Sequence, residues 1–145
     1  MQAKRLVVRQ VMTPQVISVS KTDTMELVEK LFQKHNIHHI PVLDSENKLI
    51  GLVSKSDYLR MLHGQTLFRT VKVDEYNKIM MKTTLVKDIM VEDVVAIEPD
   101  QPVSEALQLF RKNLFRALPV VSEGKLIGIL TPYDLMSEFP FPKMS

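Results

Sequence analysis

The chain repeats itself once at a fixed interval, and this repeat constrains the fold more than any other sequence feature. The matches keep their order across the unit, at an offset of 78 positions before a hairpin turn and 77 after it. They include Met12 with Met90, Leu31-Phe32 with Leu109-Phe110, Pro41-Val42 with Pro119-Val120, Lys48-Leu49-Ile50-Gly51 with Lys125-Leu126-Ile127-Gly128, and Asp57 with Asp134. Chance similarity rarely preserves Pro, Gly and Asp together with their spacing. We therefore expect two copies of one supersecondary unit.

Each copy predicts three strands and two helices in the order βαββα. Short β-branched or apolar runs predict strands over residues 16–19, 39–43, 49–53, 94–97, 117–121 and 126–130. Helix-start signals at 22–24 and 99–102 precede apolar residues at helical spacing, and shorter helices are predicted over 56–62 and 132–137. The proline inside each second strand indicates an edge position or a strand start. Gly51 and Gly128 interrupt the third strands, where a side chain would obstruct close backbone approach.

One such unit cannot bury its sheet alone, whereas two copies can. We therefore predict an α/β (α+β) fold of two tandem βαββα repeats, packed sheet to sheet about a pseudo-two-fold axis. The predicted divisions are repeat 1 over 1–63, a linker over 64–84, repeat 2 over 85–138 and a C-terminal tail over 139–145. Within the linker, residues 74–81 can form a helical turn or two. Two phenylalanines in the tail favour its packing on a neighbouring repeat or subunit.

The composition narrows the classes of function. Lys and Arg number 19 and Asp and Glu 17 among 145 residues, and this small excess does not favour binding to nucleic acid. The chain has no cysteine, which excludes disulfides and thiol chemistry. The sequence shows no signal peptide and no apolar run long enough to span a bilayer, so we expect a soluble, cytoplasmic protein without membrane contact.

Three motifs, each present twice and in order, resemble those of the cystathionine-β-synthase-type (CBS) domain. Val11-Met12-Thr13-Pro14 resembles its opening "h-M-T-P", with Ile89-Met90-Val91 as a weaker copy. The runs His39 to Asp44 and Ala117 to Val121 resemble its "h-P-V-h-D" strand, with Ser122 in place of the second acid. Leu49 to Asp57 and Leu126 to Asp134 resemble its "L-h-G-h-h-[ST]-x-x-D" signature. The resemblance implies a stand-alone tandem CBS pair (Bateman module) that forms a disc-like homodimer.

The resemblance also implies binding of AMP, ADP, ATP or an S-adenosyl compound in clefts between the repeats, with no cofactor required. The ligand motif maps onto Ser54, Lys55, Ser56 and Asp57, and onto Thr131, Tyr133 and Asp134. A carboxylate can accept hydrogen bonds from both ribose hydroxyls, and the preceding hydroxyl can donate to phosphate. The same residues are good helix caps, and the two interpretations are compatible.

Further ligand contacts follow from the family pattern. The phosphate end would lie near His38 or Arg116, with charge added by Lys55, although Arg116 and Lys55 can equally be solvated surface residues. A phosphate contact of His38 would make binding pH-sensitive. His39 would line the cleft or the strand edge. Apolar surfaces for the adenine are implied at Val16, Ile17, Val94, Val95, Ala117 and Ile129, which can also be ordinary core residues.

Neither catalysis nor a metal site is predicted. The histidines at 35, 38 and 39 cluster, but no cysteine or acid group accompanies them, as zinc would require. No Ser/His/Asp arrangement, Gly-rich phosphate loop or paired carboxylates can be defended. The sequence therefore predicts a regulatory module that senses an adenosine nucleotide and changes its interaction with another protein. The alternative is a dimerisation or scaffold module with no nucleotide, in which both motifs serve only as caps.

Overall fold

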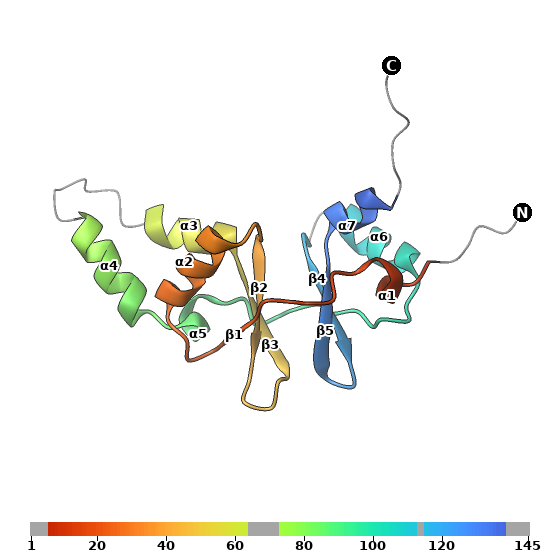
Figure 1. The fold of residues 1–145 in the computed structure, drawn as a ribbon, viewed down its shortest axis with the longest axis horizontal. Coiled ribbons are helices and arrows are strands. Elements are labelled where there is room, and N and C mark those ends of the chain that lie inside the picture. Colours follow the sequence, from red (N-terminus) through yellow and green to blue (C-terminus); the bar gives the residue numbers. More distant parts are fainter. Residues whose placement is uncertain (1–5, 64–72, 113–114, 139–145) are drawn as a thin grey trace, which may run out of the picture. The chain divides into compact units, whose positions relative to one another are not determined.

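The computed structural model describes residues 6–63, 73–112 and 115–138, which form two compact units (Figure 1). The central unit comprises Ile17–Val94, and the terminal unit combines Met1–Val16 with Val95–Ser145. The compact units therefore divide the chain differently from the sequence repeats. The opening segment of the first repeat belongs to the terminal unit, and the opening segment of the second repeat belongs to the central unit.

The central unit is a three-stranded sheet with helices. Its strands lie in the order β1-β2-β3, with β1 parallel to β2 and β2 antiparallel to β3. The elements are β1 (Val19–Ser20), α2 (Met25–Lys34), β2 (His39–Leu43), β3 (Leu49–Ser54), α3 (Lys55–His63), α4 (Val73–Thr83) and α5 (Val86–Ile89).

The terminal unit repeats most of this arrangement. Its antiparallel strands β4 and β5 pair as β2 and β3 do, and a parallel bridge from Ile97 to Val120 stands at the position of β1. The elements are α1 (Val8–Val11), α6 (Val103–Arg111), β4 (Leu118–Ser122), β5 (Lys125–Leu130) and α7 (Pro132–Ser137). The predicted mixed α and β fold with two copies of one unit is confirmed.

Two strand predictions need correction. The first strands are shorter than predicted: the first copy pairs with β2 only from Val19 onward, and the second forms a single bridge at Ile97. In addition, Pro41 lies within β2, the middle strand of its sheet, and not at an edge. The middle strand tolerates this proline because β1 begins to pair only at Val42, so no β1 partner requires an N–H from Pro41.

Each unit has its own hydrophobic core between helix and sheet. In the central unit the amphipathic helix α2 buries Met25, Val28 and Phe32 against the strands. In the terminal unit α6 buries Val103 and Ala106 in the same way. These apolar stripes recur at helical spacing, and their burial is the main force that holds each helix to its sheet.

Among the differences between the two units is a polar contact at the positions of Tyr58 and Glu29. Buried Tyr58 on α3 donates a hydrogen bond to the Glu29 carboxylate on α2 and stacks at an angle on Phe32. Burial, together with the hydrogen bond and charge of Glu29, raises the pKa of the Tyr58 hydroxyl above its usual range. The repeat offsets place Leu135 and Leu107 at these positions in the terminal unit. The central unit therefore has a hydrogen bond between two helices where the terminal unit has two leucines.

The predicted linker contains a complete helix. Helix α4 packs against α2, and its Met81 is buried in the central core. The prediction of a helical turn or two over 74–81 was therefore too short. Residues 64–72 of the predicted linker and the predicted tail over 139–145 lie outside the described residues.

The exchange of opening segments is held by backbone hydrogen bonds at equivalent positions. In the terminal unit, the Val8 N–H donates to the carbonyl oxygen of Gln101 over 2.9 Å. In the central unit, the Val86 N–H donates to the carbonyl oxygen of Asp23 over 2.8 Å. Since 8 aligns with 86 and 23 with 101, each opening helix docks on the other copy in the same way.

The third-strand glycines accommodate these exchanged segments, and the close backbone approach predicted at both glycines is confirmed. A Cβ at Gly128 would lie 2.5 Å from the Met12 sulfur and 3.0 Å from the Thr13 carbonyl oxygen. A Cβ at Gly51 would lie 2.5 Å from the Met90 sulfur and 3.2 Å from the Val91 carbonyl oxygen. The repeated methionine and the repeated glycine are therefore partners in packing, which explains why both recur.

Candidate functional site

The acid of the second motif lies where β5 passes into α7. Thr131 is the N-cap of α7, and its hydroxyl oxygen accepts a hydrogen bond from the Asp134 N–H over 3.3 Å. One carboxylate oxygen of Asp134 accepts bonds from the Thr131 N–H over 2.9 Å and from the Thr131 hydroxyl over 3.1 Å. This reciprocal capping box fixes the carboxylate at the start of the helix.

The other carboxylate oxygen of Asp134 faces Thr13. Two backbone hydrogen bonds of 2.9 and 3.0 Å pair Thr13 with Ile129 on β5, which brings the Thr13 side chain beside α7. The Thr13 hydroxyl then donates to Asp134 Oδ1 over 3.1 Å. Among the described residues, the side-chain bonds to Asp134 therefore come from neutral groups, and no ion pair reaches it.

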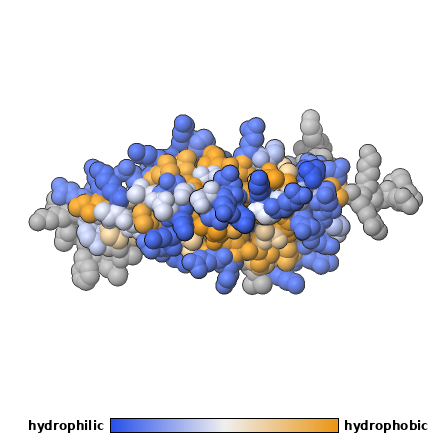
Figure 2. All heavy atoms as spheres, turned by 90° about the horizontal axis from the view of Figure 1, so that it is seen from below, coloured by the Kyte–Doolittle hydropathy of each residue, from blue (hydrophilic) through white to orange (hydrophobic). Residues whose placement is uncertain are grey.

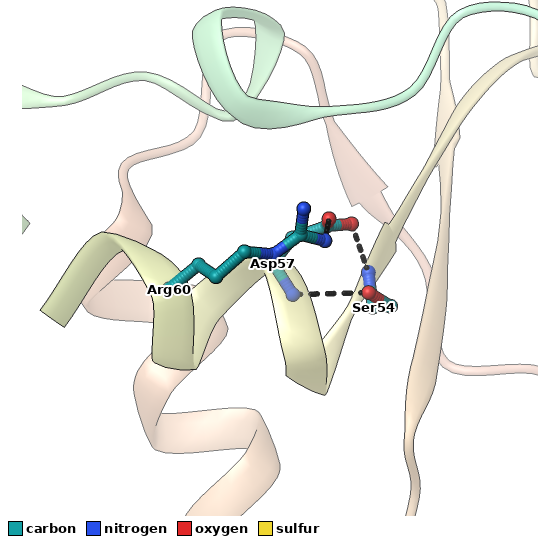
Figure 3. A network of polar contacts seen from close by, with 3 residues as sticks. All are labelled: Ser54, Asp57 and Arg60. Atoms are coloured by element: carbon teal, nitrogen blue, oxygen red, sulfur yellow. Dashed lines mark hydrogen bonds and ion pairs between the residues drawn. The ribbon is translucent and has the colours of Figure 1, made fainter. Parts of the chain in front are cut away.

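The first motif forms the same cap with a different outer partner (Figure 3). The Ser54 N–H donates to Asp57 Oδ2 over 3.0 Å, and the Asp57 N–H donates to the Ser54 hydroxyl oxygen over 3.0 Å. The Arg60 guanidinium, one turn further along α3, donates to Asp57 Oδ1 over 2.7 Å. The oxygen that accepts from a hydroxyl in the terminal unit accepts from a cation in the central unit.

The remaining predicted residues of the terminal unit differ in exposure. Tyr133 is 77% exposed beside Asp134, and Val95 is 38% exposed. Arg116 is exposed just before β4, Val16 and Ile129 are half-buried, and Ala117 is buried. The structure therefore brings Ile129, Thr131 and Asp134 together, with Tyr133 open to solvent next to them.

The remaining predicted residues of the central unit lie around the start of α3. The Lys55 N–H donates to the His38 carbonyl oxygen over 2.8 Å, and His39 pairs with Ser54 across β2 and β3. His38 and Ser56 are exposed, whereas Ile17, Lys55 and Val94 are half-buried. His38, His39, Ser54 and Lys55 thus share one end of the β2–β3 pair.

The described part of the chain holds no group of three or more His, Cys, Asp or Glu side chains placed to bind a metal ion. None of its helices is both long and apolar enough to cross a bilayer.

Sequence reasoning missed Thr13 and Arg60 as partners of the motif acids. The signal was present in the repeat, because Thr13 aligns with Val91 and Arg60 with Ser137. The copies share the acids and the capping residues but differ at the two positions that supply the outer partners. Positions that differ between the two copies therefore indicate where the surroundings of the two motif acids differ.

The sequence matches the family model of the CBS domain over residues 8–64 and 86–140. The chain therefore belongs to the CBS domain family and carries two copies of the domain. The predicted family is confirmed by this match, which covers most of the chain.

Three comparisons with known proteins agree with this assignment. MJ1426 of Methanocaldococcus jannaschii is 29% identical over 151 residues, covering 90% of this chain and 89% of that protein. The inosine-5'-monophosphate dehydrogenase of the same organism is 33% identical over 135 residues, covering 92% of this chain but only 24% of that enzyme. The crystal structure of CBSX2, an Arabidopsis thaliana CBS-pair protein, in complex with AMP has a TM-score of 0.70 and 30% identity, covering 91% of this chain and 94% of that chain.

Proposed function

We propose that the chain is a regulatory module that binds an adenosine-containing ligand, AMP, ADP, ATP or an S-adenosyl compound, and thereby changes its interaction with a partner protein. The observation that carries this proposal is the Asp134 carboxylate. It is fixed by a helix cap, and its second oxygen holds only the neutral hydroxyl of Thr13 among the described residues. A carboxylate so placed can accept hydrogen bonds from neighbouring ribose hydroxyls.

Similarity to CBSX2 supports the choice of ligand class. That protein was crystallised with AMP, and it is 30% identical over nearly the whole of both chains. A binding function is also supported over catalysis, because the match to the dehydrogenase covers 24% of that enzyme. We therefore propose that the module senses the ligand and performs no reaction on it.

The proposed contacts divide between the two units. In the terminal unit, Asp134 would take the ribose, Thr131 and Arg116 the phosphate end, and exposed Tyr133 and Val95 the adenine. The less exposed Val16, Ala117 and Ile129 complete this proposed set. In the central unit the proposed set is Ile17, His38, His39, Ser54, Lys55, Ser56, Asp57 and Val94.

We further propose that the module acts as a homodimer. Apolar side chains reach the surface among hydrophilic ones, as the face in Figure 2 shows. On α7, Tyr133 and Met136 are 77% and 56% exposed, and Leu59, which aligns with Met136, is 39% exposed on α3. A second copy would cover these equivalent helix positions. A ligand could then alter partner binding only by favouring one of two states of the assembly.

A thermal-shift assay with AMP, ADP, ATP and S-adenosylmethionine tests the proposed ligand class. A ligand at one hundred times its Kd should stabilise the folded chain by roughly 2.7 kcal/mol. For a chain of this size, that corresponds to a rise in Tm on the order of 8 °C. The shift should be smaller in Asp134→Asn, which keeps an oxygen for the cap, and should disappear when Asp57→Asn is added. It should be retained in the control Asp44→Asn, a half-buried turn carboxylate outside the proposed ligand contacts.

The alternative function is a dimerisation or scaffold module without nucleotide. It is favoured by one observation: both motifs already form complete helix caps, so the motif residues have a structural role without any ligand. The absence of a Tm shift with all four ligands, in a protein that is folded and dimeric by sedimentation, would favour this alternative.

A further inference from the structure

The two motif acids carry different outer partners at the same atom. Asp57 Oδ1 accepts from the Arg60 guanidinium over 2.7 Å, whereas Asp134 Oδ1 accepts from the Thr13 hydroxyl over 3.1 Å. The Asp57 side chain is 14% exposed and the Arg60 side chain 77%, and the guanidinium lies against the Asp57 carboxylate (Figure 3). The carboxylate is therefore already paired with a positive charge.

The terminal unit has no such cation at the equivalent position. Ser137 takes the place of Arg60 and donates its hydroxyl to the Tyr133 carbonyl oxygen on its own helix, over 3.0 Å. The Thr13 hydroxyl is a neutral donor on an exposed residue, so a ligand hydroxyl can replace it with a bond of the same kind. Both bonds end on a carboxylate, but the Arg60 donor also carries a positive charge, so a neutral ligand hydroxyl replaces it less readily than it replaces the Thr13 hydroxyl.

We propose that Arg60 is a built-in competitor for the ligand at Asp57, so that the chain takes its adenosine ligand through Asp134 first. This inference rests on the proposed function and adds an order of occupancy to it. Arg60 acts through Asp57 as a positioning and specificity-determining residue. The competition is modest, since the Arg60 partner is 77% exposed and an ion pair in contact with water contributes little free energy. Its size corresponds to an affinity difference of about two- to five-fold between ribose bound with and without Arg60.

The test removes one motif acid at a time, so that only the other can bind ligand. It then exchanges Arg60 and Ser137, the residues one turn after the two acids. In an Asp134→Asn background, Arg60→Ser should tighten binding at Asp57 about two- to five-fold. In an Asp57→Asn background, Ser137→Arg should weaken binding at Asp134 by a similar factor, because it places the same side chain one turn after the acid. Isothermal titration calorimetry of the full chain measures both changes. Arg60→Gln, which keeps most of the side-chain length, serves as the second variant if Arg60→Ser unfolds.

Two ligands separate the ribose from the phosphate. Adenosine has no phosphate, so a competition for Asp57 predicts the same fold-change with adenosine as with AMP. A direct contact of Arg60 with phosphate would instead make Arg60→Ser bind AMP more weakly and leave adenosine unchanged. Salt gives another readout, because salt weakens ion pairs that are open to solvent, so the effect of Arg60 should shrink as the salt concentration rises toward about 1 M.

The outcomes distinguish this inference from the function on which it rests. If wild-type chain binds AMP through Asp134 but Arg60→Ser and Arg60→Gln leave binding at Asp57 unchanged or weaker, the competition is refuted and the proposed function stands. If neither adenosine nor AMP binds any of these proteins, both fail. Tighter binding at Asp57 with both ligands, together with weaker binding in Ser137→Arg, supports the competition.

Discussion

The central and terminal units pack their opening segments in the same way, but they differ in the charged and polar side chains at equivalent positions. Both place a methionine of the other copy on a third-strand glycine, and both cap the following helix with a hydroxyl residue and an acid. The central unit adds polar ties at Tyr58–Glu29 and Asp57–Arg60, where the terminal unit has leucines and an uncharged serine. The features shared by the units are packing contacts and helix caps, whereas the features found only in the central unit add charged and polar contacts.

The largest expected effect concerns the shared packing. Gly128→Ala should lower the free energy of unfolding by about 1 to 3 kcal/mol, because the added Cβ overpacks Met12 and the Thr13 carbonyl. Gly51→Ala should cost slightly less, since its nearest backbone atom is 3.2 Å away instead of 3.0 Å. Urea unfolding measures both changes.

Gly124→Ala is the contrasting control for overpacking. A Cβ at Gly124 meets nothing within 4 Å, but its φ of +80° is in the left-handed region, so its cost of about 1 kcal/mol comes from the backbone. Combining Met12→Ala with Gly128→Ala should give a cost smaller than the sum of the two changes. Simple additivity would contradict the proposed contact between Met12 and Gly128.

The next largest effect on the free energy of unfolding should come from the hydrogen bond between Tyr58 and Glu29 in the central unit. Tyr58→Phe leaves the half-buried Glu29 carboxylate without its donor, at a cost of about 1 kcal/mol to the free energy of unfolding. Adding Glu29→Leu, the residue type found at the equivalent position 107, should recover part of this loss. Tyr76→Phe, on a tyrosine that is 50% exposed, should be neutral.

The same tyrosine predicts a dependence on alkaline pH. The folded chain raises the pKa of Tyr58, first through burial and then through Glu29, so its contribution is complete below about pH 10 and is lost as pH rises through the raised pKa. The free energy of unfolding should therefore fall above about pH 10 in the wild type more than in Tyr58→Phe. Equal slopes in the two proteins, measured by denaturant unfolding at several pH values, would show that Tyr58 is not perturbed.

The smallest expected effect is the loss of a cap hydroxyl, which should lower the free energy of unfolding equally in the two units. Ser54→Ala and Thr131→Ala each remove a cap hydroxyl that accepts from the acid's backbone N–H, and each should cost roughly 0.5 to 1 kcal/mol. Ser56→Ala, on an exposed residue inside the first motif, is the matched control. A clearly larger loss in one unit would mean that the two motifs do not share a capping role.

The sequence predicted most of the elements because their periodicities are local. The spacing of Met25, Val28 and Phe32 indicated α2, and the matching apolar runs indicated both hairpins within a residue of their observed bounds. The exchange of opening segments was not predictable in this way. Because Gly51 and Gly128 have nearly the same sequence context, Met12 could pack on either of them without changing the pattern.

The candidate site shows the same division. Ser54, Asp57, Thr131 and Asp134 were found because both copies carry them. Thr13 and Arg60 were missed because each occurs in one copy only, and long-range contacts such as the one between Thr13 and Asp134 leave no local pattern. The repeat marks these positions as different between the copies, but the structure was needed to show that they supply the outer partners of the two acids.

An AMP titration followed by ¹⁵N-HSQC spectra tests the inequivalence of the units most directly. The backbone N–H groups of Ser54 and Thr131 each donate to the acid of their own motif, so their resonances report on the two carboxylates without any mutation. We expect the Thr131 and Asp134 resonances to shift at lower AMP concentration than those of Ser54 and Asp57. Shifts of Ser54 and Asp57 first, or of all four at one concentration, would contradict a preference for Asp134.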